Sequence, residues 1–281
     1  MLSTRFPRIT SALELVKQIS SRASDHDVDI VAAGLSFYAL LGLFPSMLAL
    51  VSLYGLVADP ASIQSVVNSL TATLPLQAQK LVQEGLTEFV ARTSSDLTFS
   101  VFVGIVGVLW SSSSGMGALV HAINVATDNP QHRSFFGRRL IALSFTLVGV
   151  ISVAVVVPAL TALPRLAHLL RADTPLVILP SLVLMAIAFV ALLVLFRYAP
   201  YKQTLRMRDV VPGAAAASLS WLLMSAAYSL YVRFLSRMSS TYGVLEGVIV
   251  LELWFYLSAL MLLYAVELNV ELGRRRAAAP A

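Results

Sequence analysis

The chain has 281 residues, of which 58% are hydrophobic and only 12% are charged, with a net charge of +5 and no cysteine. Soluble globular domains carry about 25% charged residues, so this composition excludes an ordinary water-soluble domain and indicates a protein embedded in lipid. The missing cysteines exclude disulfides, thiolate catalysis and thiolate metal sites.

Residues 1–29 precede the first apolar stretch and are predicted to form a cytoplasmic N-terminal segment. They contain no uninterrupted apolar core and no small-residue cleavage site, so they do not resemble a cleaved signal peptide. Between Arg8 and Arg22, apolar residues recur at near-helical spacing: Ile9, Leu13, Val16 and Ile19. This spacing predicts a short amphipathic helix that either lies on the membrane surface or packs its apolar side against the protein.

A cluster of acidic residues with one histidine, from Asp25 to Asp29, follows this predicted helix. It does not fit a calcium-binding EF-hand loop, which needs a glycine after the third acid and a glutamate at its twelfth position, where Ser36 stands. Capping of the next helix by Asp27 or Asp29 explains the cluster better. The sequence predicts no metal site, and we expect no cofactor.

Six apolar stretches are each long enough to cross a bilayer, which takes about 20 predominantly apolar residues. They run approximately over Ile30–Val57, Leu97–Val125, Leu140–Leu163, Leu176–Phe196, Val210–Val232 and Val244–Val270. The first five contain no Asp, Glu, Lys or Arg. Because lipid offers no hydrogen-bond partners to the backbone, each stretch is expected to be a helix. The predicted fold class is therefore all-α, with residues 30–272 forming a polytopic membrane domain of six transmembrane helices.

Lys and Arg are distributed unevenly between the segments that connect these stretches. Fourteen lie in the segments on the side of the N-terminus, and six lie on the other side. The positive-inside rule therefore predicts that both termini are cytoplasmic, with residues 273–281 forming a cytoplasmic tail. Topology and anionic headgroups account for the basic net charge, so membrane lipids are the expected partners and nucleic acid is not.

The longest connecting segment, residues 58–96, is predicted to be extracytoplasmic. Its apolar residues are spaced as in two short amphipathic helices: Ile63, Val66, Val67 and Leu70 before Pro75, then Leu81, Val82, Leu86, Phe89 and Val90. The pattern is typical of a lid that rests on the outer leaflet or over the bundle. A gate that contacts a substrate is the alternative.

The second apolar stretch carries a small and polar face. At about 100° per residue, five side chains fall in one narrow sector: Ser114, Gly117, His121, Asn124 and Asp128. Close helix packing with interhelical hydrogen bonds is one explanation, and a polar groove within the membrane is the other. A catalytic pair of Ser114 and His121 is excluded, because seven residues on one helix separate them by about 10 Å. No catalytic residue is predicted.

The sixth stretch contains four glutamates, of which Glu246 and Glu271 lie near its ends. Glu252 lies deeper, where an unpaired carboxylate must be protonated or face a water-filled cavity. It is a candidate for proton or cation coupling, and a structural partner such as His121 or an arginine from a loop is the alternative. Polar residues of the second and sixth stretches form the predicted polar pathway: Ser114, His121, Asn124, Glu252, Glu267 and Asn269.

Short motifs along the chain occur in an order that is typical of one family. They are Ala33-Gly34-Leu35-Ser36-Phe37-Tyr38 with Phe44-Pro45, Trp110, Ser114-Gly115, Ala122-Ile123-Asn124, Arg197-Tyr198-Ala199-Pro200, Pro212-Gly213-Ala214, Trp221, Tyr231, Tyr242-Gly243, Trp254 and Glu267-Leu268-Asn269. Together they resemble the YihY/BrkB family of bacterial inner-membrane proteins, over nearly the whole chain. Glu252 departs from the family pattern, in which the turn before the tryptophan is usually apolar, whereas Glu267 and Asn269 match it.

The resemblance implies a six-helix bundle in the bacterial cytoplasmic membrane. Family members were once labelled ribonuclease BN, a label regarded as mistaken, and others are called virulence or serum-resistance factors. A transporter or translocase of a lipid or small solute is our leading hypothesis, because it explains the polar faces and the lid. A non-transporting structural or assembly factor of the envelope is the alternative, and a homo-oligomer is compatible with either. A ribonuclease is disfavoured, since the sequence offers no paired carboxylates or histidine cluster on a water-facing domain.

Overall fold

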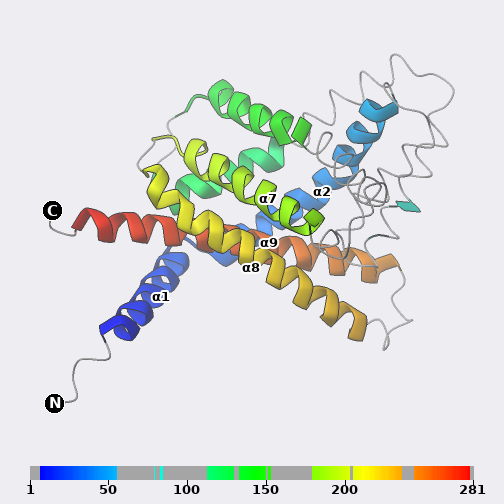
Figure 1. The fold of residues 1–281 in the computed structure, drawn as a ribbon. Helices are drawn as coiled ribbons and strands as arrows, with labels where there is room; N and C mark the ends of the chain where they lie inside the picture. Colours follow the sequence, from blue (N-terminus) through cyan, green and yellow to red (C-terminus); the bar gives the residue numbers. More distant parts are fainter. Residues whose placement is uncertain are drawn as a thin grey trace.

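The computed structural model describes at least part of each of the six predicted membrane helices and some of the segments that connect them. The described residues are 7–55, 79, 83–84, 113–129, 133–149, 151–152, 179–202, 205–235 and 244–278. Every regular element among them is an α-helix, which confirms the all-α class (Figure 1). The predicted lid helices within residues 58–96 lie almost entirely outside the described residues, so that prediction stays open.

The helices coincide with the predicted elements. They are α1 (Pro7–Asp25), α2 (Val28–Gly55), α7 (Leu179–Tyr198), α8 (Met207–Leu235) and α9 (Val244–Ala278), and two more helical segments cover residues 113–126 and 135–149. Each of the six predicted apolar stretches therefore contains helix, and α1 covers the predicted N-terminal helix.

The number of membrane crossings is not confirmed at six. Among the described residues, two helices are long and apolar enough to span a bilayer, Met207–Tyr231 and Gly247–Ala278. A third span results if Leu13–Asp25 and Val28–Leu43 count as one. The second and third predicted stretches are described only in part, and their described helices are shorter than a bilayer span.

A sharp corner separates α1 from α2, whose axes differ by 64°. The N–H of Asp27 donates to the carbonyl oxygen of Ser24, and the carbonyl oxygen of Asp27 accepts from the N–H of Val31 in the first turn of α2. Asp27 has a φ of 48°, a left-handed conformation that aspartate tolerates better than most residues. This single residue therefore turns the chain from one helix into the next.

Helix α9 is the central element of the described fold. It packs against α1, α2 and α8, and α7 packs against α8. Figure 1 shows α8 crossing α9 and α1 projecting from the same end as the C-terminus. Farther along the crossing pair, Trp221 and Trp254 meet edge to face with ring centroids 5.8 Å apart, and Nε1 of Trp221 donates to Oγ of Ser258.

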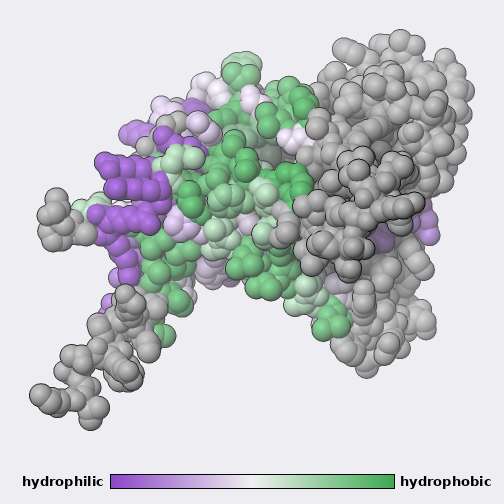
Figure 2. Space-filling view, in the orientation of Figure 1, coloured by the Kyte–Doolittle hydropathy of each residue, from purple (hydrophilic) through white to green (hydrophobic). Residues whose placement is uncertain are grey.

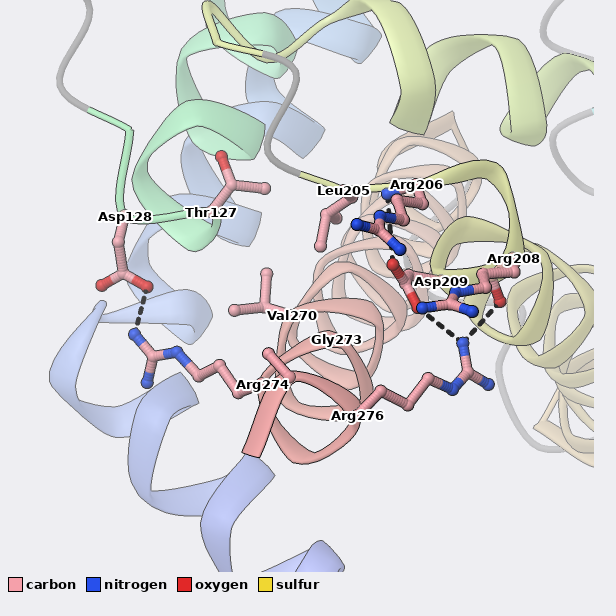
Figure 3. Close-up of a pocket in the computed structure, with 11 residues that line it drawn as sticks. Thr127, Asp128, Leu205, Arg206, Arg208, Asp209, Val270, Gly273, Arg274 and Arg276 are labelled. Atoms are coloured by element: carbon pink, nitrogen blue, oxygen red, sulfur yellow. Dashed lines mark hydrogen bonds and ion pairs between the residues drawn. The ribbon is translucent and has the colours of Figure 1, made fainter. Parts of the chain in front are cut away.

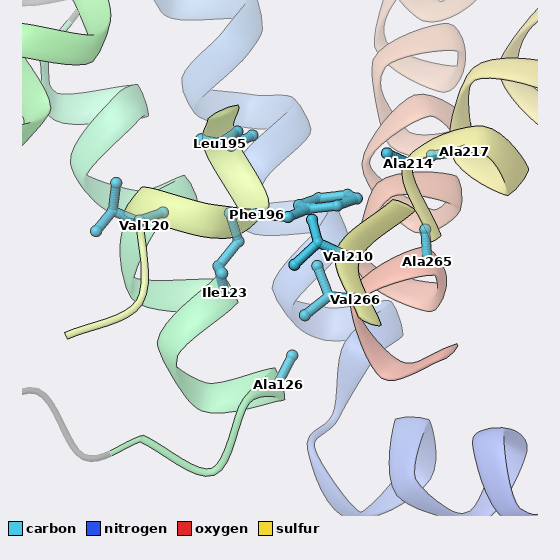
Figure 4. Close-up of a cluster of buried hydrophobic side chains, with 11 residues drawn as sticks. Val120, Ile123, Ala126, Leu195, Phe196, Val210, Ala214, Ala217, Ala265 and Val266 are labelled. Carbon is cyan, nitrogen blue, oxygen red and sulfur yellow. The ribbon is translucent and has the colours of Figure 1, made fainter. Parts of the chain in front are cut away.

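The main apolar core lies where α7, α8, α9 and residues 113–126 meet (Figure 4). Its large members come from all four elements: Ile123, Phe196, Val210 and Val266. Small residues let the helix backbones approach closely around them: Ala126, Ala199, Ala214, Ala217 and Ala265. In lipid, such close packing rather than removal from water is what holds helices together.

The outer surface is apolar over its middle. Figure 2 shows hydrophobic residues across the centre of the described surface and hydrophilic residues gathered at the end that bears the C-terminus. On α8, for example, Leu219, Leu223 and Leu230 are all more than half exposed. A belt of exposed leucines is a liability in water and ordinary in lipid, so the surface agrees with the composition.

Gly213 lies where α8 packs tightly against α9, and replacing it with alanine is expected to destabilise the protein. A Cβ atom there would collide with the side chain of Asn269 and the carbonyl oxygen of Ala265. Overpacking of this kind typically costs about 1–3 kcal/mol. We expect Gly213→Ala to lower the midpoint of thermal unfolding in detergent by several degrees. Gly34→Ala is the matched control, because a Cβ at Gly34 meets nothing within 4 Å; equal midpoints for the two variants would contradict the packing.

Candidate functional site

Basic residues from four separate segments gather at one end of the described helices. Figure 2 shows hydrophilic residues concentrated there. The turn after residues 113–126 binds arginines of α1 and α9 through Asp128. The start of α8 is tied to α9 through Arg276, and the end of α7 is tied to the segment after residue 129 through Arg133. These are the four segments that the positive-inside count placed on the cytoplasmic side, and we refer to this part of the molecule as the basic end.

Glu267 lies at the basic end with no exposed surface. Nε of Arg22 donates a hydrogen bond to its Oε2 over 2.8 Å, and Nδ1 of His26 lies 2.6 Å from its Oε1. A carboxylate buried in a membrane protein is strongly unfavourable unless it is paired and hydrogen-bonded. Glu267 therefore requires these partners, and the pairing joins α9 to the end of α1 and to the corner before α2.

Asp128 is the second carboxylate that Arg22 contacts. Nη2 of Arg22 donates to Oδ2 of Asp128 and to the carbonyl oxygen of Ala126, each over 2.9 Å. Arg274 donates to the same Oδ2 over 3.0 Å, and Nε2 of His26 lies 3.5 Å from Oδ1. Two guanidinium groups and two carboxylates thus form one network across three elements, with the imidazole of His26 between the two carboxylates.

The network keeps Asp128 ionised. Burial raises the pKa of Asp128, but the hydrogen bond from Arg22 and the charges of Arg22 and Arg274 outweigh this effect and hold the pKa below its usual value. A lowered carboxyl pKa contributes stability above the usual value of about 4, and the contribution is lost as the pH falls through the lowered pKa. At neutral pH the aspartate is therefore a charged partner for both arginines.

A proline inside α8 explains one of the contacts between α8 and α9, and a second contact lies beside it. Pro212 has no backbone N–H, so the carbonyl oxygen of Arg208, four residues earlier, has no partner within the helix. Nη1 of Arg276 donates to that oxygen over 2.7 Å. The N–H of Gly213 donates to Oδ1 of Asn269 over 2.8 Å. Asn269 and Arg276 are seven residues apart and so share a face of α9, which fastens α9 to the irregular first turns of α8.

The backbone after α7 is held in a similar way. The last carbonyl oxygens of a helix have no partner within it. Asn124, which is only 1% exposed, donates from Nδ2 to the carbonyl oxygen of Ala199 over 3.3 Å and accepts from the N–H of Tyr201 over 2.7 Å. Arg133 donates to the carbonyl oxygens of Ala199 and Pro200 over 3.0 and 3.1 Å. Asn124 therefore serves the end of α7 as a cap.

Glu252 has a different environment from Glu267. Oγ of Ser36 on α2 lies 2.7 Å from Oε1 of Glu252 and 2.8 Å from the carbonyl oxygen of Ala33. Oε2 of Glu252 is buried and has no hydrogen-bond partner among the residues that the structure describes. The structure thus pairs Glu252 with a serine rather than with His121 or a loop arginine, and leaves one of its oxygens unused.

The six residues of the predicted pathway lie at separate positions. Ser114 accepts a hydrogen bond from Nη1 of Arg139 over 3.3 Å, whereas His121 is exposed. Three of the others lie at the basic end, Asn124 beside the end of α7 and Glu267 and Asn269 on α9, whereas Glu252 lies at the α2–α9 contact. None of the hydrogen bonds described above joins two of the six, so a continuous pathway stays a prediction.

Sequence reasoning missed the partners of Glu267. From the sequence, Arg22 serves only to assign orientation, and His26 is considered only as a member of the acidic cluster. The two residues are four positions apart and so share a helix face. A buried glutamate needs a cation, and that requirement together with the shared face is the signal that points to this pair. No signal in the sequence predicts that Asp128 joins them.

A pocket of about 690 Å³ opens at the basic end (Figure 3). It lies between the start of α8, the last turns of α9 and the turn after residues 113–126. Its charged lining consists of four arginines and two aspartates: Arg206, Arg208, Arg274, Arg276, Asp128 and Asp209. Within the described ranges, no group of three or more His, Asp or Glu is placed to hold a metal ion. The pocket therefore carries more positive than negative side chains in its lining.

Comparison with known proteins agrees with the resemblance in the sequence. A family model described as virulence factor BrkB matches residues 19–281. The putative ribonuclease-like protein YfkH of Bacillus subtilis is 31% identical over 272 residues, covering 94% of this chain and 97% of that protein. UPF0761 membrane proteins of Chromohalobacter salexigens and Alteromonas mediterranea are 24% and 25% identical, over 96% and 90% of this chain and 66% and 85% of their own lengths. No solved structure matches. The chain belongs to the BrkB family of membrane proteins.

Proposed function

We propose that this protein is a transporter or translocase of a lipid or small solute in the cytoplasmic membrane, and that the transported molecule binds in the pocket at the basic end. The pocket is the observation that supports this most. Its volume of about 690 Å³ falls within the range of roughly 300–1,000 Å³ that is usual for ligand sites. Its walls are the ends of helices from three separate elements.

Two ion pairs join the walls of the pocket, and they differ in exposure. Asp128 and Arg274 join the turn after residues 113–126 to α9, with 44% and 56% of their side chains exposed. Arg276 and Asp209 join α9 to α8, but the side chain of Asp209 is only 9% exposed. An exposed ion pair contributes only about 0–1 kcal/mol, so the Asp128–Arg274 contact opens at little cost in free energy. Asp128 stays bound to Arg22, and the buried Glu267 pair keeps α9 against α1, so the proposed opening is limited to the Asp128–Arg274 contact.

Glu252 is the proposed coupling group. It lies in the first third of α9, far along the helix from the basic end, and its Oε2 is buried without a partner among the described residues. A carboxyl group in such a place exchanges a proton or binds a cation more readily than one committed to an arginine. Glu267, which is committed to Arg22 and His26, is assigned a structural role instead.

Flux through reconstituted liposomes tests this proposal. Transbilayer movement of fluorescent phospholipids and uptake of small solutes are measured with and without a pH gradient. For wild type and for Glu14→Gln, we expect movement that the gradient accelerates, because Glu14 is exposed on α1 and remote from Glu252. For Glu252→Gln, we expect the same rate with and without the gradient, since the variant side chain carries no titratable proton. Identical gradient dependence in the two variants would remove Glu252 from the mechanism, and no flux by wild type would contradict transport.

We also propose that both termini are cytoplasmic, because the four segments that meet at the basic end carry most of the Lys and Arg. The chain has no cysteine, so single cysteines introduced by Lys17→Cys and Arg138→Cys report on sidedness. Both sites are exposed. In right-side-out vesicles we expect neither to react with a membrane-impermeant maleimide until the vesicles are opened. Labelling of either cysteine in sealed vesicles would show that the termini lie on the opposite side of the membrane.

A structural or assembly factor of the envelope is the second candidate. One observation favours it: the buried side chains of Asn124 and Glu267 and the Oδ1 atom of Asn269 are used for contacts within the chain. A protein of this class would show no flux, and crosslinking in cells would recover the same partner repeatedly. Flux by the purified protein alone would rule it out as the sole function.

A further inference from the structure

The lining of the pocket contains more positive charge than its own carboxylates neutralise. Four arginines face two aspartates. Asp128 already binds Arg274 and, from outside the pocket, Arg22. Asp209 accepts from Arg276 through Oδ1 over 2.6 Å and from the backbone N–H of Arg206 through Oδ2 over 3.1 Å. Both carboxylates are therefore occupied.

Arg206 and Arg208 are the arginines that remain. Among the described residues, neither guanidinium forms an ion pair or hydrogen bond with a carboxylate, although both side chains line the pocket and are exposed to it (Figure 3). Their backbone is fixed: the carbonyl oxygen of Arg206 accepts from the N–H of Val210, and that of Arg208 accepts from Arg276. Two cations are thus held by a rigid helix start with their charged groups available to a ligand.

The geometry around these arginines favours a phosphate group. A guanidinium presents a planar fork of N–H donors that matches phosphate oxygens, and several forks around one cavity recognise one phosphate together. Apolar side chains of Leu205 and Val270 line the same pocket and provide a surface for the part of the ligand that bears the phosphate. Basic pockets between membrane helices on the cytoplasmic side are known to hold anionic headgroups.

We propose that the pocket binds the phosphate group of an anionic ligand through Arg206 and Arg208, with Arg274 released from the exposed pair with Asp128 to complete the site. The phosphate comes from a lipid headgroup or from a soluble phosphate compound. This inference rests on the proposed function only where it takes the phosphate ligand to be the transported substrate. Binding in detergent requires no transport, so an experiment can contradict the binding proposal without contradicting the transport proposal, and the reverse.

Titration calorimetry on the purified full-length protein in detergent tests the site. The probes are dioctanoyl phosphatidylglycerol, dioctanoyl phosphatidylcholine and inorganic phosphate. The test variant is Arg206→Gln/Arg208→Gln. The matched control is Lys17→Gln/Arg138→Gln, which removes two exposed charges from segments outside the pocket. Unchanged elution volume and thermal midpoint establish that both variants are folded.

We expect phosphatidylglycerol to bind to wild type and to the control alike, and about 30-fold more weakly to the test variant. Each arginine near an anionic surface contributes about 1 kcal/mol, and 1.4 kcal/mol is tenfold in affinity. Weak or absent binding of inorganic phosphate then identifies a lipid headgroup as the source, whereas binding of inorganic phosphate with comparable affinity identifies a soluble phosphate compound. Equal affinity of the test and control variants for both anionic probes, or no binding of either by wild type, would overturn the proposal.

Discussion

The ion pair between Arg22 and Glu267 is the constraint on which the described fold depends. A glutamate without any exposed surface requires a cation, and the cation is supplied by the end of α1, 245 positions away in the sequence. To bring Arg22 and His26 against α9, the chain must turn sharply at Asp27 before α2 begins. The same guanidinium then reaches Asp128 and so fixes the turn after residues 113–126. One buried charge thus positions three elements at the basic end.

Irregular backbone imposes the second set of contacts and changes how the polar residues are interpreted. Pro212 deprives α8 of a hydrogen bond, and Arg276 satisfies the carbonyl oxygen that is left. Asn124 satisfies the backbone beyond the end of α7. Backbone polar groups that are removed from water must be bonded inside the protein, so these side chains are retained for the backbone that they serve. A ligand site is therefore better sought in the pocket than on the polar helix faces. Among the described residues, the guanidinium groups of Arg206 and Arg208 in the pocket bind no backbone oxygen.

The sequence predicts the helices well and their contacts poorly. Uninterrupted apolar stretches identify the helical segments, because lipid permits little else, and the bias of Lys and Arg correctly groups the segments that meet at the basic end. Pairings such as Arg22 with Glu267 are different: they join residues far apart in the chain, and no periodicity connects them. The helical sector of the second stretch does not determine burial, since His121 is exposed while Asn124 is buried. Neighbouring helices decide burial, and one helix does not contain that information.

A double-mutant cycle on Arg22 and Glu267 tests the central claim most directly. The free energy of unfolding is measured for Arg22→Gln, Glu267→Gln and the double variant, with a Lys17→Gln/Glu267→Gln cycle as control. Removing one partner of a buried pair typically costs about 3–5 kcal/mol, because the other charge is left uncompensated. We predict that the double variant loses at least about 1 kcal/mol less than the sum of the single losses, and that the control cycle is additive. Additive losses for Arg22 and Glu267 would show that the pair does not hold the basic end together.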